Sequence, residues 1–516
     1  MKHIINKKIK EFGLCIIWAF TILFFVSADS YTHDLYYRWD SSWFFTCGKA
    51  WVEGLHPYID FADSKGPILW LINALAYILS PYNYLGVFWL SVISYALVFY
   101  IDYKIALLFL KKEKLSWIVV IILPIAYFNP WYHFETSAEC WCQPFISLVI
   151  YRILRLIVLQ NYCNKELCIT GFILGIGVIW TFLIKFSITI MIGISECYCL
   201  YIIIREKGNF FKALSFWLLG VFFIAAPITL YLFQIGSLEA FITEYLINTM
   251  KTISSPNPIE IYLHEWLHTF ANAFYATLFF ICLIGCFHIG KTTSKDRLFL
   301  IFSFLGFYSI AIHHNIHRHY LNSCLFFVLF FIIYLVYLNR EKLLFLNYIK
   351  QSVFSAFFLF FIIMTNWTHT EGFFVPNLFF LNNQDRKDYY TVAYYMAQIP
   401  HPTILYYRFA ERGYGTPSGA LPASKYWSTQ TNPTQEMLDL QHEDAISRKA
   451  DFIISYQKKE NDDLFSHIGY IKLYEFGGLA LYSKQQLKGP SDSFNVSNID
   501  VLLKRDKLAP IIKNQH

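Results

Sequence analysis

The residues best able to do chemistry lie between positions 38 and 67, where the sequence reads RWDSSWFFTCGKAWVEGLHPYIDFADSKGP. This stretch places Asp40, Asp63 and Lys65 between two strongly apolar segments. Charged side chains held against a bilayer are costly to place there and usually mark a functional site. We therefore expect chemistry on a lipid-carried substrate at this loop.

Further charged residues stand at the predicted ends of other apolar segments. A second outer loop carries Glu135 and Glu139, and Lys185 stands where two apolar helices are interrupted. A charge at that depth needs a partner or water. Lys185 is expected either to contact a phosphate or to extend its ammonium group to the interface. Judged from the loop sequence alone, Glu139 is expected to be a solvated loop carboxylate that pairs with Lys49 or Lys65.

A histidine-rich segment at 313 to 322 reads HHNIHRHYLN. His313 and His317 share a helix face, as a pair of metal ligands would. No carboxylate or cysteine accompanies them, so a divalent metal is the less favoured interpretation. Arg318 beside Tyr320 suits a phosphate better, because a guanidinium group offers paired donors.

Composition places the chain among integral membrane proteins. Of its 516 residues, 56% are hydrophobic and only 15% are charged, and the mean hydropathy is +0.40. No glycine-rich nucleotide motif follows a strand and no P-loop occurs, so a soluble nucleotide site is unsupported. All cysteines precede residue 325, which excludes a disulfide framework in the C-terminal part. Cys47, Cys140 and Cys142 are expected either to form one bridge between outer loops or to remain buried thiols.

Apolar runs long enough to cross a hydrocarbon core of about 30 Å recur along the chain, and we expect about eleven spans. They lie near 11 to 28, 85 to 110, 116 to 128, 143 to 160, 168 to 184, 187 to 204, 213 to 235, 268 to 289, 297 to 313, 321 to 338 and 347 to 365. The first span lacks a clean cleavage site, so we interpret it as uncleaved and not as a signal peptide. The run from 68 to 80 is short enough to lie in the interface instead of crossing it.

Basic residues gather in alternate short loops, which predicts a cytoplasmic N-terminus. An odd number of spans then places the chain after residue 365 outside. There the apolar runs shorten, and strands are expected at 402 to 407, 450 to 456, 468 to 476 and 478 to 484. Helices are expected at 385 to 399 and 433 to 448, the second with Asn432 as N-cap. Tyr414 and Trp427 are expected either to stack on sugar rings or to pack this domain against the membrane part.

The order of these features resembles that of the polytopic GT-C glycosyltransferases, in particular bacterial relatives of protein O-mannosyltransferases (glycosyltransferase family 39) and of lipid A aminoarabinose transferases. The resemblance covers residues 1 to 365, with the outer loop at 29 to 67 and the motifs RWD and PYIDFADSKGPIL. It implies an all-α membrane domain of about 11 helices, an extracytoplasmic α/β domain over 366 to 488, and a tail over 489 to 516. It also implies a polyprenyl-phosphate sugar as donor, a glycan, lipid or protein hydroxyl as acceptor, and no cofactor.

The resemblance also implies roles for individual residues. Asp40 matches the aspartate that acts as general base, although it could equally cap the following helix. Lys65 matches a lysine that contacts the lipid phosphate, and Asp63 stands near the position of a glutamate that precedes this lysine in relatives. Ser41 occupies a place where the family commonly has glutamate, which weakens any second acidic role there.

Further implied roles concern the other loops. Glu139, with Glu135 nearby, matches the acidic residue that completes the pocket in similar proteins. Arg318 and Tyr320 match an arginine and a tyrosine that flank the lipid phosphate, and Lys185 would be a third phosphate contact.

These features predict a glycosyltransferase in the cytoplasmic membrane that acts on its outer face, with inversion at the anomeric carbon. The main alternative is a transporter or flippase of lipid-linked saccharides, which would bury charges midway through several spans. Here the charges concentrate near one face. A glycan polymerase or ligase shares the outer loops but usually has its catalytic residues in one large late loop.

Overall fold

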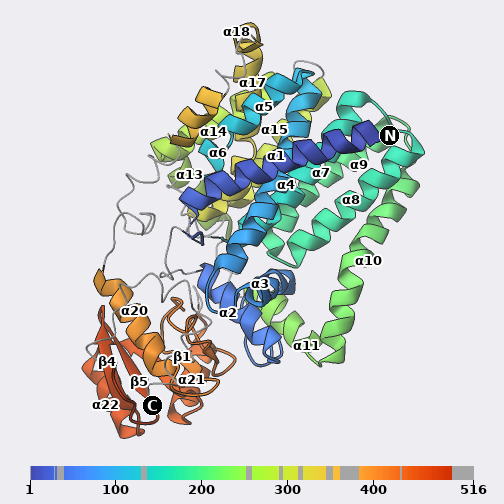
Figure 1. Cartoon of the computed structure of the whole chain (residues 1–516). Coiled ribbons are helices and arrows are strands. Elements are labelled where there is room, and N and C mark those ends of the chain that lie inside the picture. The colour runs from blue at the N-terminus through green and yellow to red at the C-terminus, as the bar shows by residue number, and fades with distance from the viewer. Residues whose placement is uncertain are drawn as a thin grey trace. The chain divides into compact units, whose positions relative to one another are not determined.

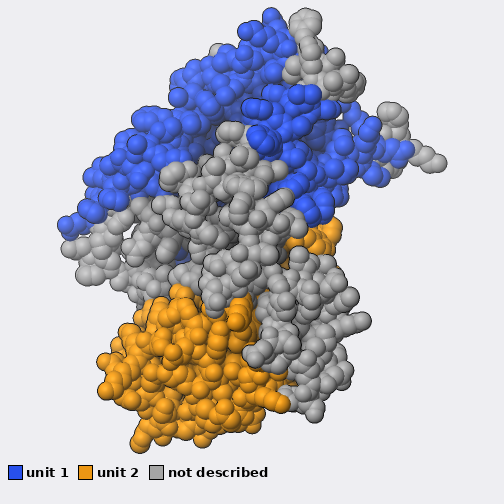
Figure 2. All heavy atoms as spheres, turned by 60° about the vertical axis from the view of Figure 1, so that its left-hand side comes forward, with its two compact units in different colours: residues 1–28, 91–231, 253–375 blue, residues 29–90, 232–252, 376–516 orange. Residues whose placement is uncertain are grey.

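The computed structural model describes residues 2–27, 29–31, 40–128, 136–250, 258–289, 294–311, 318–344, 352–360, 383–429 and 433–490. It divides into two compact units (Figure 2). The first unit consists of residues 1–28, 91–231 and 253–375. The second consists of residues 29–90, 232–252 and 376–516. Each unit is described by itself below.

The first unit is helical (Figure 1). Its helices are α1 (Lys2–Val26), most of α4 (Leu85–Leu110), α5 (Glu113–Ile122), α6 (Pro124–Tyr127), α7 (Ala138–Leu159), α8 (Asn164–Phe182), α9 (Phe186–Arg205), most of α10 (Phe210–Gln234), α13 (Pro258–Ala271), α14 (Ala273–Ile289), α15 (Ser294–Ala311), α16 (Asn322–Leu325), α17 (Val328–Leu338) and α18 (Arg340–Leu344), with a short 3-10 turn, η3 (Arg318–Leu321), before α16. A further helix covers residues 352–360.

The predicted spans coincide with described helices. Six helices are long and apolar enough to cross a membrane, namely Asn6–Val26, Leu85–Leu110, Ala138–Leu159, Asn164–Phe182, Phe186–Arg205 and Phe210–Gln234. The other expected spans coincide with shorter or interrupted helices, and most of the last one lies outside the described residues. The expected break between two spans near 184 is confirmed, because α8 ends at Phe182 and α9 begins at Phe186.

Glycines let two of these helices approach closely. A Cβ atom on Gly175 of α8 would lie 2.0 Å from the carbonyl oxygen of Trp217 on α10, and one on Gly220 of α10 would lie 2.2 Å from that of Phe172. Gly171 and Gly175 form the small-xxx-small pattern that allows backbone-to-backbone packing of membrane helices. Large side chains of α10 such as Phe222 are exposed, as expected for a face that meets lipid.

The second unit combines short helices with a five-stranded sheet. It contains α2 (Asp40–Val52), α3 (Pro67–Leu79), α11 (Leu238–Phe241), a π-helical turn η2 (Ile242–Asn248), α20 (Asn383–Met396), α21 (Gln435–Ile446) and α22 (Lys459–His467). Its strands are β1 (Thr403–Tyr406), β2 (Leu421–Pro422), β3 (Phe452–Tyr456), β4 (Ile471–Phe476) and β5 (Leu479–Ser483). With its 13 residues, α3 is about 20 Å long, too short to cross a core of about 30 Å as a straight helix.

The sheet has the order β2-β1-β3-β5-β4, and β1, β4 and β5 are labelled in Figure 1. Strand β1 runs parallel to β2 and β3, with Ile404 opposite Phe452, whereas β5 is antiparallel to β3 and β4. The predicted strands at 402 to 407, 450 to 456, 468 to 476 and 478 to 484 are therefore confirmed within a few residues. The last two are joined at Gly477 and Gly478, which both have positive φ angles.

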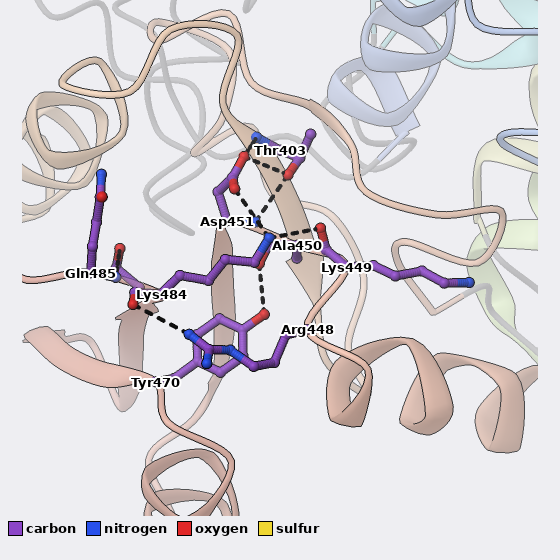
Figure 3. Close-up of polar contacts among 9 residues, drawn as sticks. Thr403, Arg448, Lys449, Ala450, Asp451, Tyr470, Lys484 and Gln485 are labelled. Carbon is purple, nitrogen blue, oxygen red and sulfur yellow. Dashed lines mark hydrogen bonds and ion pairs between the residues drawn. The ribbon is translucent and has the colours of Figure 1, made fainter.

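Polar contacts surround the N-terminal ends of strands β1 and β3 (Figure 3). The Asp451 carboxylate accepts hydrogen bonds from the Thr403 backbone N–H (3.0 Å) and hydroxyl (2.8 Å) and from Lys484 Nζ (3.2 Å). Arg448 donates to the Lys484 carbonyl oxygen, and Tyr470 donates to the Ala450 carbonyl oxygen. Asp451, Arg448 and Lys484 thus link residues at the ends of β1, β3 and β5.

Some local predictions differ from the structure. The predicted N-cap Asn432 is wrong, because the side chain of Thr434 accepts the capping hydrogen bond from Met437 N and α21 begins after it. Strand β2 and helix α22 were not predicted. All eleven cysteines are free thiols, so the alternative of one bridge between outer loops is wrong. Residues 491–516 of the expected tail lie outside the described residues.

Candidate functional site

In the second unit, Asp40 stands in the first turn of α2. Residues 41 to 50 of this helix are all buried, so α2 is a core helix whose N-terminal end carries a half-buried carboxylate. The partial positive charge of a helix N-terminus favours an anion at this place. Ser41 Oγ donates to Asp29 Oδ1 at 3.4 Å, which joins the start of α2 to the residues before it. A carboxylate in this position can accept a proton from a hydroxyl group.

The loop between α2 and α3 brings Asp63 and Lys65 into the electrostatic surroundings of Asp40. Asp63 is buried and accepts hydrogen bonds from Ser64 N (2.6 Å) and Ser64 Oγ (3.2 Å). Burial raises the pKa of Asp63, the Lys65 charge opposes that change, and the Asp40 charge adds to it. The Lys65 carbonyl oxygen accepts from the Tyr58 hydroxyl at 2.9 Å, which fixes the backbone beside the ammonium group. Asp40, Asp63 and Lys65, three of the predicted site residues, therefore lie close enough to influence one another's charge.

In the first unit, Glu139, Lys185 and Tyr320 form a second cluster. Glu139 lies in the first turn of α7, is buried, and forms an ion pair with Lys185 in the break between α8 and α9. The Lys185 ammonium group also lies 3.6 Å from the centre of the Tyr320 ring, which attracts a cation. Within this unit, Lys185 therefore supplies the partner that the charge of Glu139 needs, and Glu139 supplies the partner that was expected for Lys185.

The remaining predicted residues of this region are only partly described. Arg318 begins the 3-10 turn that carries Tyr320, but its side chain lies outside the described residues. Glu135 and the histidines at 313, 314 and 317 also lie outside them. Gln143 Nε2 donates to the Asn322 carbonyl oxygen at 2.6 Å, which ties α7 to the segment after Tyr320. Among the described residues, no group of three or more His, Cys, Asp or Glu is arranged to hold a metal ion.

Two buried charges lie where α2 contacts residues 383 to 490, here called the sheet domain. The sequence analysis considered Lys49 only as a possible partner of Glu139, and it did not single out Glu411. Lys49 of α2 has no exposed surface and donates to the Ala420 carbonyl oxygen. Glu411, in the loop after β1, is also buried, and its Oε1 accepts from Tyr406 Oη (3.2 Å) and Gly413 N (2.6 Å). The sequence did contain a signal for the burial of Lys49, because it is the only lysine in a mainly apolar helix. Glu411 stands in a loop whose sequence has no pattern that would identify a buried carboxylate.

Further contacts join the sheet domain to the rest of the second unit. Trp427 is fully buried and packs on Trp43 of α2, with ring centres 5.5 Å apart, so it packs the domain and offers no face to a sugar. Glu244 of the π-helical turn pairs with Lys425 (2.5 Å) and accepts from Tyr426 Oη (2.9 Å). The same segment, residues 425 to 427, thus contacts two other parts of this unit.

Two carboxylates lie buried within spans of the first unit, which sequence reasoning also missed. Asp102 of α4 accepts from Tyr127 Oη at 3.2 Å, and Glu196 of α9 accepts from Trp217 Nε1 at 2.8 Å. The expectation that charges concentrate near one face is therefore only partly right. Tyr127 and Trp217 are both neutral donors, and their hydrogen bonds fix the packing of neighbouring helices.

Comparisons with known proteins bear on the fold. No family model matches the chain, and no curated protein matches its sequence. The structure of ArnT from Cupriavidus metallidurans bound to undecaprenyl phosphate matches with a TM-score of 0.58 and 10% identity, over 93% of this chain and 99% of that one. The apo structure of that ArnT gives 0.57 and 10%, over 92% and 97%. An oligosaccharyltransferase from Archaeoglobus fulgidus gives 0.42 and 11%, over 91% and 73%.

The match to ArnT extends over nearly the whole of both chains, including the small sheet in the C-terminal region. Its low sequence identity means that it establishes the fold and not the chemistry. The predicted fold class is confirmed: this chain is a mostly helical polytopic membrane protein with a small sheet in its C-terminal region and the fold of ArnT.

Proposed function

We propose that this protein is an integral membrane glycosyltransferase that moves a sugar from a polyprenyl-phosphate donor to a hydroxyl acceptor. The observation that carries this proposal is the match in fold to ArnT, whose structure holds undecaprenyl phosphate, over 99% of the ArnT chain. The acceptor would be a glycan, a lipid or a protein. The leaving phosphate is carried by the donor itself, and we propose that the reaction proceeds without a cofactor.

The described residues supply groups suited to this reaction. In the second unit, Asp40 would take the proton of the acceptor hydroxyl as its oxygen attacks the anomeric carbon, and the configuration would invert. Lys65, held by the backbone beside buried Asp63, would stabilise negative charge on the departing phosphate. Asp63 would keep the Lys65 ammonium group in place.

The first unit supplies a second set of groups. Lys185 would contact the lipid phosphate, with Glu139 and the Tyr320 ring fixing its ammonium group. Arg318, two residues before Tyr320, would add paired donors to the phosphate, and Glu135 would complete the acidic side. Glu139 is therefore proposed to act on the reaction through Lys185.

Mass spectrometry of surface glycans and lipid-linked sugars tests the proposal. Cells with and without this protein should differ by one sugar residue on the acceptor, and the polyprenyl-phosphate form of that sugar should accumulate when the protein is missing. A lipid-linked sugar that accumulates on the inner side of the membrane, with no transfer by the purified protein, would favour a transporter and contradict the proposal.

The proposed site requires that the sheet domain lies on the outer side of the cytoplasmic membrane. A reporter that is active only outside the cytoplasm, fused after Lys484, should therefore be active, because basic loops favour the inside. The same reporter fused after Arg205, in a predicted inside loop, is the matched control and should be silent. Activity of the Arg205 fusion alone would reverse the topology.

A further inference from the structure

Helix α2 packs against β2, an edge strand of the sheet. Lys49 of α2 donates to the carbonyl oxygen of Ala420, which precedes β2, and the Trp43 ring packs on Trp427, which follows β2. The loop between β1 and β2 carries Glu411 and Thr416, and the Thr416 hydroxyl hydrogen-bonds to Tyr84 Oη at 3.0 Å. The sheet domain therefore contacts α2 on both sides of β2.

Glu411 is the centre of these contacts. It accepts hydrogen bonds from Tyr406 Oη and Gly413 N, and Ser42 of α2, two residues after Asp40, lies beside Gly413 and favours the ionised form of the Glu411 carboxylate. Its other carboxylate oxygen is buried with no hydrogen-bond partner among the described residues. A buried carboxylate of this kind needs a counter-charge, and the ammonium group of Lys49 supplies one from the same helix.

We propose that Glu411 and Lys49 are positioning residues that hold α2 so that Asp40 is correctly placed for the reaction. Glu411 acts on the first turn of α2 through Ser42, and Lys49 anchors its last turn to the Ala420 carbonyl oxygen. The role assigned to Asp40 rests on the proposed function, whereas the anchoring of α2 does not. The sheet domain is thus a support for the catalytic helix.

The test compares Glu411→Gln with Asp451→Asn in the full-length protein in detergent. Glu411→Gln keeps the shape of the side chain and removes its charge. Asp451→Asn changes the hydrogen bonds that join the starts of β1 and β3 to the residue after β5, in which α2 takes no part (Figure 3). Two quantities are measured, namely the hydrogen exchange of backbone amides at 41 to 50 and the kinetics of sugar transfer.

Glu411→Gln should speed amide exchange across α2 and lower kcat by about 10- to 100-fold, because small displacements of a catalytic group are costly. KM for the donor should not change, since Asp40 acts on the acceptor. The control should leave α2 exchange and kcat at wild-type values. Ser42→Ala, which removes one hydroxyl and no charge, should change both quantities in the same direction by a smaller factor.

The double variant Lys49→Met/Glu411→Gln should recover part of the lost kcat, because it no longer buries an unbalanced ammonium group. Wild-type exchange at 41 to 50 in both Glu411→Gln and Ser42→Ala would overturn the proposal. So would equal effects of Glu411→Gln and Asp451→Asn. Absence of transfer by the wild-type protein would instead remove the proposed function, and the exchange measurements would still decide whether the anchor exists.

Glu411 and Lys49 also predict how the thermal stability of the protein depends on pH. Burial raises the pKa of Glu411 from 4.5 to about 7 and lowers the pKa of Lys49 from 10.5 to about 8. Other titratable groups that face Glu411 are Cys47 of α2, Tyr406 of β1 and Tyr389 of α20, and Glu53 faces Lys49.

Between pH 5 and 7, folded protein keeps a proton on Glu411 that unfolded protein has lost, so stability from this group falls as pH rises. Between pH 8 and 10, folded protein has lost a Lys49 proton that unfolded protein keeps, so stability from this group rises with pH. Tm measured from pH 5.5 to 10 should therefore pass through a minimum near neutral pH. Glu411→Gln should remove much of the fall in Tm on the acidic side of this minimum, and Lys49→Met much of the rise on the alkaline side. If the Tm curves of wild type and Glu411→Gln ran parallel over this pH range, Glu411 would not be the group responsible.

Discussion

Replacing Asp40 by Asn should abolish sugar transfer while the protein remains folded and able to bind its donor. The substitution keeps the size of the side chain at the start of α2 and removes only the group proposed to accept the proton of the attacking hydroxyl. Loss of a general base typically slows a reaction by about 100- to 10,000-fold. The measurement is kcat of the purified variant, with donor binding determined in the same detergent.

A matched control lies in the same outer loop. Asp60 is an exposed carboxylate that accepts a hydrogen bond from His56 N at 2.6 Å, and Asp60→Asn should transfer sugar at the wild-type rate. If Asp40→Asn also transferred at that rate, Asp40 would contribute only to the stability of α2. If Asp40→Asn lost donor binding together with turnover, its role would be in binding and not in proton transfer.

Replacing Lys185 by Gln should weaken donor binding by about 10- to 150-fold, the value of one charge-assisted hydrogen bond of roughly 1.5–3 kcal/mol. The substitution leaves buried Glu139 without its partner, which by itself costs roughly 3–5 kcal/mol of stability. Donor binding must therefore be measured at a temperature where the variant is folded.

The double variant Lys185→Gln/Glu139→Gln separates the two effects. It replaces the ion pair by two neutral amides, so its Tm should recover toward the wild-type value because no isolated charge remains buried. Donor binding should stay weak, because the cation is still missing. Recovery of both Tm and donor binding in the double variant would show that Lys185 serves the packing of α7 against α9 and not the phosphate.

The sequence predicted the helical part of the fold well because spans are defined by local apolar length. The break near 184 is visible for the same reason, since Lys185 interrupts a run that is otherwise continuous. The sheet was recognisable from short β-branched and aromatic runs such as FIISY. Strand β2 is only two residues long and contains a proline, and α22 is a nine-residue polar helix, so neither has a local pattern that identifies it.

The partners of the predicted residues could not be derived from the sequence. Glu139 and Lys185 are 46 positions apart, and Lys49 and Ala420 are 371 apart. From the sequence alone, any of several lysines could pair with a given carboxylate, and only the packing of the helices determines which one does. Sequence reasoning therefore singled out Glu139, Lys185 and Tyr320 one by one, but it did not predict that Lys185 pairs with Glu139 and lies over the Tyr320 ring.

The contacts between α2 and the sheet domain also constrain how the chain is threaded through the bilayer. The hydrogen bond from Lys49 of α2 to the Ala420 carbonyl oxygen cannot form across a lipid core, and neither can the one from Ala62 N, in the loop after α2, to the Lys425 carbonyl oxygen (3.1 Å). Residues 40 to 66 and 383 to 490 must therefore face the same compartment, whichever compartment that is. Since α3 is too short to cross, the chain between them crosses an even number of times. These contacts alone therefore require an even number of membrane crossings. An insertion that added a single crossing between residues 80 and 380 would place α2 and the sheet domain on opposite sides of the membrane.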